Sequence, residues 1–170
     1  MYILKKIIVI IFVLSLLNTS AHSDQNVKFA DIDFIVQNTE IGKNTLIKIE
    51  KINKSNIDKL NGLQKELKDR ENEIKIKKKI ISEDEFNREV EKLKKQISDF
   101  NKKKDTMVKN YTDVKNRELK SLFATINPII QNYMNENSIE ILINSKNLFM
   151  GNVNSDLTKV LIKEINNKSK

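Results

Sequence analysis

The middle of the chain is rich in side chains suited to binding. Four lysines are crowded into five consecutive positions: Lys75, Lys77, Lys78 and Lys79. Isoleucines lie among and before them, and four of these are candidate contacts: Ile52, Ile57, Ile76 and Ile80. Ammonium groups attract acidic partners, and exposed apolar side chains make weak contacts with other apolar groups. The two kinds together indicate a surface that binds acidic, partly apolar molecules.

Groups that could catalyse a reaction are scarce. The chain has no cysteine and one histidine, His22, so a thiol nucleophile and thiolate metal ligands are excluded. Imidazole is the usual general base at neutral pH and the commonest metal ligand. Carboxylate-only catalysis stays open, but no spacing in the sequence points to it. We therefore predict no enzyme activity, no cofactor and no metal site.

The first 23 residues have the three regions of a secretory signal peptide. Two lysines precede an apolar run over residues 7–17, and Ala21 and Ser23 supply small side chains at the −3 and −1 positions of a cleavage site. The run is too short to span a bilayer, which takes about 20 helical residues. We expect export and cleavage after Ser23, which also removes the only histidine.

Two long helices are predicted by apolar residues at alternating steps of three and four, here called seam positions. The first series covers residues 46–81, with seven of eleven positions apolar, and the second covers residues 86–114, with eight of nine. Ser82 and Glu85 have the spacing of a capping box, so we expect a tip near residues 81–85. Two such stripes are hidden from water when the helices pack antiparallel as a hairpin.

The predicted hairpin arm covers residues 43–133 and carries the positive charge. Residues 41–104 hold nineteen basic and twelve acidic side chains, a net charge of +7, whereas the rest of the mature chain sums to −1. Two plainer interpretations stay open: the lysines can be an ordinary solvated face, and the off-seam isoleucines can widen the contact between helices. Pro128 predicts a kink over residues 124–127 rather than a helix end.

Before the arm, the sequence predicts one strand and one short helix. Residues 27–32 have the composition of a strand, and residues 31–38 favour a short helix capped by Asp31 or Asp33. Gly42 is expected to break the chain before the arm.

After the arm, the sequence predicts a second small structured region. Residues 138–144 and 147–150 are rich in β-formers and are expected to form a β-hairpin. Residues 155–165 have helical spacing, with Asp156 or Thr158 as the N-cap.

The short strands of residues 24–42 and 134–170 are too few for a core of their own, and their edges need covering. A homo-oligomer that joins the strands of several chains meets both needs. We therefore predict a mostly helical α+β fold, in which a long antiparallel helical hairpin stands on a small β body formed by oligomerisation.

Three stretches resemble the Skp/OmpH family of periplasmic chaperones. They are VKFADIDFIVQNTEIGK at residues 27–43, INPIIQNYMNENSIEILINSKNLFM at residues 126–150 and SDLTKVLIKEIN at residues 155–166. The resemblance implies a homotrimer in the periplasm, with a β-barrel built from three chains. It also implies three helical arms around a cavity that holds unfolded outer-membrane proteins.

The implied function is that of an ATP-independent holdase, which prevents these proteins from aggregating. The positive arm is also compatible with contact to an anionic lipid surface. An envelope coiled-coil scaffold or adaptor with one fixed partner is the alternative. Nucleic-acid binding is not expected, because the chain is exported and shows no recognition motif.

Overall fold

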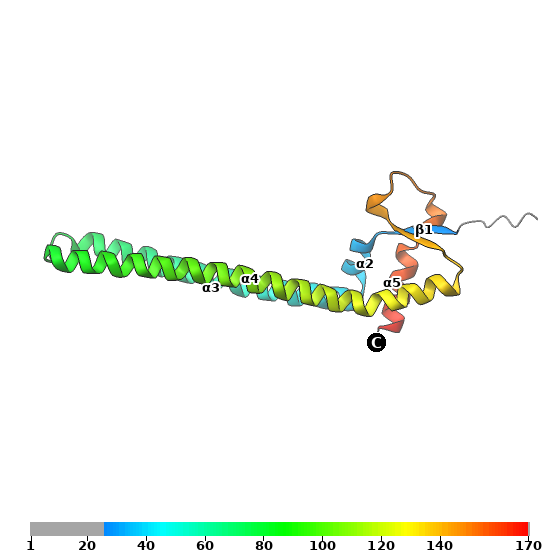
Figure 1. Cartoon of the computed structure of the whole chain (residues 1–170), viewed down its shortest axis with the longest axis horizontal. Coiled ribbons are helices and arrows are strands. Elements are labelled where there is room, and N and C mark those ends of the chain that lie inside the picture. The colour runs from blue at the N-terminus through cyan, green and yellow to red at the C-terminus, as the bar shows by residue number, and fades with distance from the viewer. Residues whose placement is uncertain (1–25, 170) are drawn as a thin grey trace, which may run out of the picture.

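The computed structural model describes residues 26–169, which form a long two-helix arm with a small body at one end (Figure 1). The elements are β1 (Val27–Ala30), α2 (Ile32–Asn38), α3 (Glu40–Lys77), α4 (Glu83–Glu136), β2 (Ile141–Asn144), two 3₁₀ turns (Ser145–Asn147 and Val153–Ser155) and α5 (Thr158–Lys168). The predicted mostly helical fold with a helical hairpin and a small sheet is confirmed. The predicted signal peptide, residues 1–23, lies outside the described residues.

The helices α3 and α4 lie side by side along the arm (Figure 1). At about 1.5 Å per residue, the 38 residues of α3 span about 57 Å and the 54 residues of α4 about 81 Å. Ten of the eleven seam positions in the first series and seven of the nine in the second are buried or half-buried. The predicted stripes are therefore the surfaces by which the two helices pack. Within residues 26–169, no helix has both the length and the hydropathy needed to cross a bilayer.

The turn at the tip covers residues 78–82, so it begins a few residues before the predicted tip near residues 81–85, and residues 83–85 already belong to α4. The α3 helix ends at Lys77, and the hydroxyl of Ser82 accepts a hydrogen bond from the backbone N–H of Glu85 (3.3 Å) at the start of α4. Ser82 is thus the N-cap of α4, as the capping-box spacing indicates. The first turn of α4 is acidic and the last turn of α3 is basic, which suits the dipoles of both helices.

The core of the body lies where α2, α5 and the end of α4 pack together. Ile35 of α2, Ile126 of α4, and Leu161 and Ile165 of α5 are at most 1% exposed. The α4 helix continues through Pro128 to Glu136, beyond its predicted end near residue 133. Figure 1 shows the course of α4 bending in its yellow part, where it enters the body. One helix therefore belongs to both the arm and the core.

The strands β1 and β2 form a parallel sheet, in which Val27 pairs with Ile141 and Ala30 with Asn144. The predicted β-hairpin is wrong, because residues 147–150 form no strand. The chain leaves β2 in a 3₁₀ turn, which the Asn144 side chain caps by accepting a hydrogen bond from the backbone N–H of Lys146 (3.2 Å). Parallel strands need a long crossover connection, and here the whole arm is that connection.

The chain breaks before α3 at Thr39, not at Gly42 as predicted. Thr39 has an extended backbone, ends α2, and accepts a hydrogen bond from the Gly42 N–H (3.3 Å) as the N-cap of α3. Gly42 is buried in the first turn of α3. A Cβ atom there would overlap the carbonyl oxygen of Val36 and lie 2.6 Å from Thr39 Oγ1. Glycine is required here by the close approach of α2, not by a turn.

Hydrogen bonds at the starts of the two short helices connect α2 with α5. Asp31 caps α2, as one of the two predicted candidates, by accepting a hydrogen bond from the Phe34 N–H (2.9 Å). The N-cap of α5 is Leu157, so the prediction of Asp156 or Thr158 is wrong. The hydroxyl of Thr158 instead donates to Asp156 (2.5 Å) and accepts from the backbone N–H of Asp31 (2.9 Å). The two side chains join α5 to the start of α2.

Two glycine substitutions test this packing. Gly42→Ala is expected to destabilise the protein by about 1–3 kcal/mol, because the methyl group has no space beside Val36. Gly62→Ala is the matched control: nothing lies within 4 Å of a Cβ built there, so it is expected to stabilise α3 by about 0.5–1 kcal/mol. Urea unfolding at one fixed protein concentration, followed by circular dichroism, measures both. Equal effects of the two variants would contradict the packing of Gly42.

Candidate functional site

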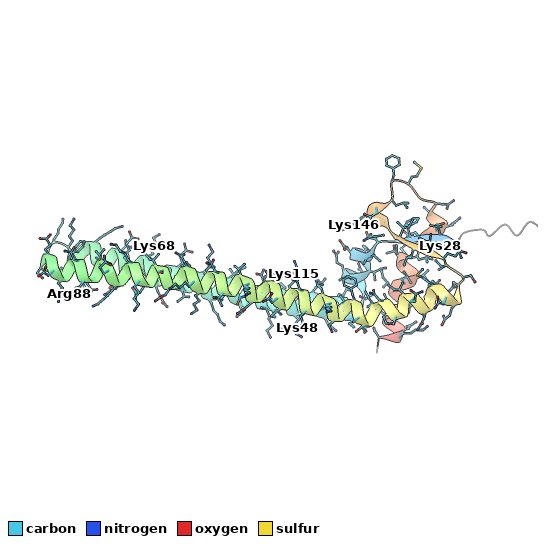
Figure 2. All side chains as sticks on the ribbon, viewed as in Figure 1. Lys28, Lys48, Lys68, Arg88, Lys115 and Lys146 are labelled. Carbon is cyan, nitrogen blue, oxygen red and sulfur yellow. The ribbon has the colours of Figure 1, made fainter. Side chains whose placement is uncertain are left out.

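The structure divides the eight predicted contact residues into two groups. Six of them occupy residues 75–80, at the end of α3 and in the turn that follows, and we call this segment the tip surface. Ile57 and Ile52 lie farther back along α3, about 28 Å and about 36 Å from Ile76. A single chain therefore brings the tip residues together but not all eight. Figure 2 shows side chains projecting along the whole length of the arm, among them Lys48, Lys68 and Arg88.

The tip surface exposes its two isoleucines. Ile76 is 72% and Ile80 78% exposed, whereas Ile74, two residues before, is 4% exposed in the seam. Ile74 is therefore buried between the two helices, whereas Ile76 and Ile80 face the solvent. Of the second group, Ile57 is exposed and Ile52 is half-buried, so only part of Ile52 is accessible to a partner.

Three of the four tip lysines make no ion pair within residues 26–169. Lys75 lies 2.6 Å from a carboxylate oxygen of Glu71, and its hydrogen bond lowers the pKa of that carboxyl. The ammonium of Lys78 lies 5.6 Å from the centre of the Phe86 ring, a cation–π distance. The ammonium groups of Lys77, Lys78 and Lys79 are therefore open to an acidic partner, beside exposed isoleucines.

A cluster of charged side chains links the two helices just below the tip. The guanidinium of Arg70 on α3 contacts Glu73 on its own helix and Glu89 on α4, and Lys92 lies 2.9 Å from Glu89. The hydrogen bond from Lys92, followed by the charge of Arg70, lowers the pKa of Glu89. Arg70 occupies a seam position, so these contacts favour one register of the two helices near the tip.

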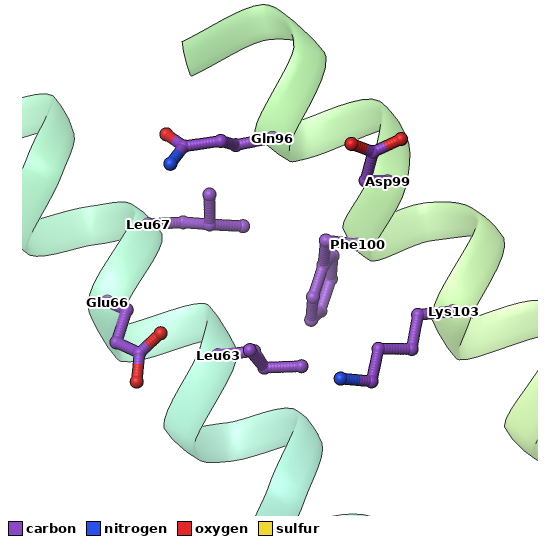
Figure 3. A pocket seen from close by; sticks show the side chains of 7 residues that line it. All are labelled: Leu63, Glu66, Leu67, Gln96, Asp99, Phe100 and Lys103. Atoms are coloured by element: carbon purple, nitrogen blue, oxygen red, sulfur yellow. The ribbon is translucent and has the colours of Figure 1, made fainter. Parts of the chain in front are cut away.

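Midway along the arm, the seam is incompletely filled. A hollow of about 270 Å³ lies between α3 and α4, and we call it the mid-arm hollow. Figure 3 shows Leu63, Leu67 and Phe100 pointing toward one another across it, with polar side chains around them. Its lining residues are Leu63, Glu66, Leu67, Gln96, Asp99, Phe100 and Lys103. Within residues 26–169, no group of three or more His, Cys, Asp or Glu side chains could hold a metal ion.

Sequence reasoning missed an exposed apolar segment in the body. Phe149 is fully exposed, Met150 is 79% and Val153 83% exposed, in the connection between β2 and α5 that we call the body loop, residues 148–153. Phe149 and Met150 belong to the predicted strand over residues 147–150, so their exposure was not expected, and Val153 was assigned to no element. Val108 on the arm is 55% exposed, and its position one residue off the seam could have identified it.

Comparisons with known proteins agree with this architecture. A family model described as outer membrane protein (OmpH-like) matches residues 26–165. Among solved structures, the chain is similar to an OmpH-like protein from Caulobacter crescentus CB15 that is described as a candidate outer membrane chaperone. The TM-score is 0.73, with 16% sequence identity and 84% of each chain covered, so the likeness shows a shared fold. No curated protein sequence matches the chain.

The ion pairs below the tip predict how the arm responds to acid. The pKa of Glu89 is lowered from 4.5 in the folded protein, so its carboxylate adds stability above about pH 4.5 and loses it as pH falls through the lower folded value. Glu89→Gln is therefore expected to lower the thermal midpoint at neutral pH, and the difference from the parent should shrink in acid. Thermal melts at several pH values, followed by circular dichroism, measure it.

Glu91→Gln is the control, because Glu91 pairs with Lys94 on its own helix (2.7 Å). It should change the midpoint less than Glu89→Gln at neutral pH. A Glu89→Gln difference that is the same at neutral pH and in acid would contradict the role of the carboxylate.

Proposed function

Because the chain belongs to the OmpH-like outer membrane protein family, we propose that it is a periplasmic chaperone, which holds unfolded outer-membrane proteins without ATP and prevents their aggregation. The observation that carries the proposal is the tip surface, where exposed isoleucines lie beside unpaired ammonium groups on a long solvated arm. The description of the Caulobacter protein as a candidate outer membrane chaperone supports the same role. The proposal involves no catalytic step.

The chemistry of the client fits this surface. Strands of an outer-membrane barrel alternate apolar and polar residues, and before insertion their apolar side has no lipid to cover it. Ile76 and Ile80 offer apolar contacts, and Lys77, Lys78 and Lys79 attract acidic segments. Each contact is weak, so retention comes from many contacts along the arms and the client can leave without an energy source. The same cations would also attract an anionic lipid surface.

A homotrimer is the proposed assembly, with residues 24–42 and 134–170 of each chain in the shared body and residues 43–133 in the arm. Among the described residues, β2 pairs only with β1, so its second edge is open. The body loop exposes Phe149, Met150 and Val153. Its Leu148 and Gly151 line a small hollow together with residues of both strands, so the loop adjoins the sheet. Neighbouring chains that pair with the edge and cover the loop would bury both. Three arms could then enclose one client in the periplasm, after signal cleavage at Ser23.

The first test concerns the isoleucines. An unfolded outer-membrane barrel protein is diluted from urea in the presence of the chaperone, and light scattering follows its aggregation. Replacing Ile52, Ile57, Ile76 and Ile80 by serine is expected to weaken client affinity while the oligomer persists. The tip pair Ile76→Ser with Ile80→Ser alone should weaken it about tenfold, if each side chain is partly buried by the client.

Ile52→Ser with Ile57→Ser is the comparison on the same helix and should have the smaller effect, because Ile52 is already half-buried. Undiminished suppression of aggregation by the fourfold variant would remove these residues from the site. Replacing Lys77, Lys78 and Lys79 by glutamine should also weaken binding at low salt, and this loss should shrink at about 500 mM salt, where charges are screened.

The second test concerns the assembly. Native mass spectrometry of residues 24–170 at micromolar concentration should give three chains, and three chains with one client after addition of the unfolded barrel protein. Phe149→Ser with Val153→Ser should shift the mass toward single chains, whereas Ile47→Ser with Val108→Ser, an equal number of exposed apolar side chains on the arm, should leave the trimer. A monomeric parent protein would contradict the proposed assembly. Capture of one stoichiometric partner, with no binding of unfolded barrels, would favour a scaffold instead.

A further inference from the structure

The arm has two flanks, one on each side of the seam between α3 and α4. The mid-arm hollow opens on one of them, which we call the hollow flank (Figure 3). Its polar lining residues each come one residue before a seam position of their own helix: Glu66, Gln96, Asp99 and Lys103. A helix turns by about 100° per residue, so residues that come one after a seam position lie on the opposite flank. We call that side the Val108 flank.

Below the tip surface, the exposed apolar side chains of the arm gather on the Val108 flank. Ile47, Ile57 and Val108 are all exposed, and each follows a seam position. Ile97, in the seam itself, is exposed as well. Ile52 precedes a seam position and is half-buried, so the hollow flank of the described arm has no exposed large apolar side chain below the tip. The two flanks therefore differ in character.

Ile57 and Val108 make one apolar patch from two helices. Leu63 of α3 faces Phe100 of α4 across the seam (Figure 3). From this pair, Ile57 lies six residues toward the body and Val108 lies eight, so their positions along the arm differ by only about 3 Å. Because they share both the level and the flank, the two side chains present a single apolar surface beside the seam.

A stripe of exposed side chains extends from this patch along α4. Ile97, Asn101, Lys104 and Val108 recur in steps of four, three and four residues, the spacing of one helix face, and all four are exposed. Lys104 belongs to no ion pair formed within residues 26–169. The stripe therefore has two apolar ends, about 16 Å apart along the helix, and an unpaired ammonium between them.

The stripe suits an extended chain better than a second helix. A helix that packs on α4 needs apolar side chains at every third or fourth position, and Asn101 and Lys104 interrupt them. An extended chain rises about 3.3 Å per residue, so about five residues cover the stripe. Apolar side chains of such a segment can contact Ile97 and the Ile57–Val108 patch, while an acidic side chain approaches Lys104.

We propose that the Val108 flank is the side of the arm that contacts the bound unfolded protein, and that a strand segment of that protein lies extended along Ile97, Lys104 and Val108. This inference rests on the proposed chaperone function and deepens it. Strands of outer-membrane barrels alternate apolar and polar residues, so one side of an extended segment is apolar. The hollow flank then faces away from the bound chain.

Cross-linking compares the two flanks directly. The chain has no cysteine, so one introduced thiol is the only attachment point for a maleimide. Asn101 and Asn110 are both exposed on α4, but Asn101 follows the seam position Phe100, whereas Asn110 precedes the seam position Tyr111. Mature Asn101→Cys and Asn110→Cys are labelled with benzophenone maleimide and irradiated with an unfolded outer-membrane barrel protein. The cross-linked yield is expected to be several-fold higher for Asn101→Cys, and equal yields would overturn the proposal.

Two neighbouring lysines separate the flank from the general charge of the arm. Lys104 belongs to the exposed stripe, and Lys103 lies on the hollow flank. Lys104→Gln should weaken binding of the unfolded barrel protein about two- to fivefold at low salt, as expected for the loss of an exposed ion pair. Lys103→Gln removes the same charge and should leave binding nearly unchanged. Equal weakening by both variants would overturn the proposal, and circular dichroism checks that both keep their helices.

The aggregation assay keeps this inference separate from the proposed function. If the parent protein suppresses aggregation but the two labelled variants cross-link equally, the Val108 flank is not the preferred side and the chaperone role stands. If neither variant cross-links and the parent protein does not suppress aggregation, the inference and the chaperone role are both wrong.

Discussion

The arm depends on the burial of two apolar stripes against each other. Only two helices take part, so each covers one side of its partner, and most seam side chains are no more than half-buried. In the arm part of α3, the two isoleucines that reach core-like burial are Ile49 and Ile74, at 7% and 4% exposed. Each helical turn of the hairpin therefore contributes little to its free energy of folding, and the stability of the hairpin comes from its length. The remaining surface must be polar to stay in solution, which is why the charge of the chain lies here.

The same pairing builds the body. The strands β1 and β2 are neighbours in the sheet although the whole arm separates them in sequence. The antiparallel packing of α3 and α4 brings the two ends of this long connection close together. The strands can therefore pair without the entropy loss of closing a long flexible loop. The continuous course of α4 through Pro128 then carries Ile126 and Ile130 into the core with α2 and α5.

Exposed apolar side chains occur in two arrangements that suit two kinds of contact. In the body, Phe149, Met150 and Val153 are exposed in one loop next to a sheet with an open edge, the arrangement expected of a lasting interface. Along the arm, exposed isoleucines are scattered among charges, and the mid-arm hollow interrupts the seam. Scattered contacts of this kind bind weakly and reversibly, as the proposed chaperone function requires.

The sequence by itself determined the elements that local rules govern. The seam, the capping box at Ser82 and the short helix capped by Asp31 all follow from residue spacing, because helix periodicity and capping act within a few positions. Tertiary structure decided what depends on distant neighbours. The partner of β2 is a strand far away in the chain, and the backbone of α2 requires glycine at position 42. Spacing likewise could not show that Ile52 is half-buried while Ile76 and Ile80 are free, because exposure depends on how a second helix lies across the first.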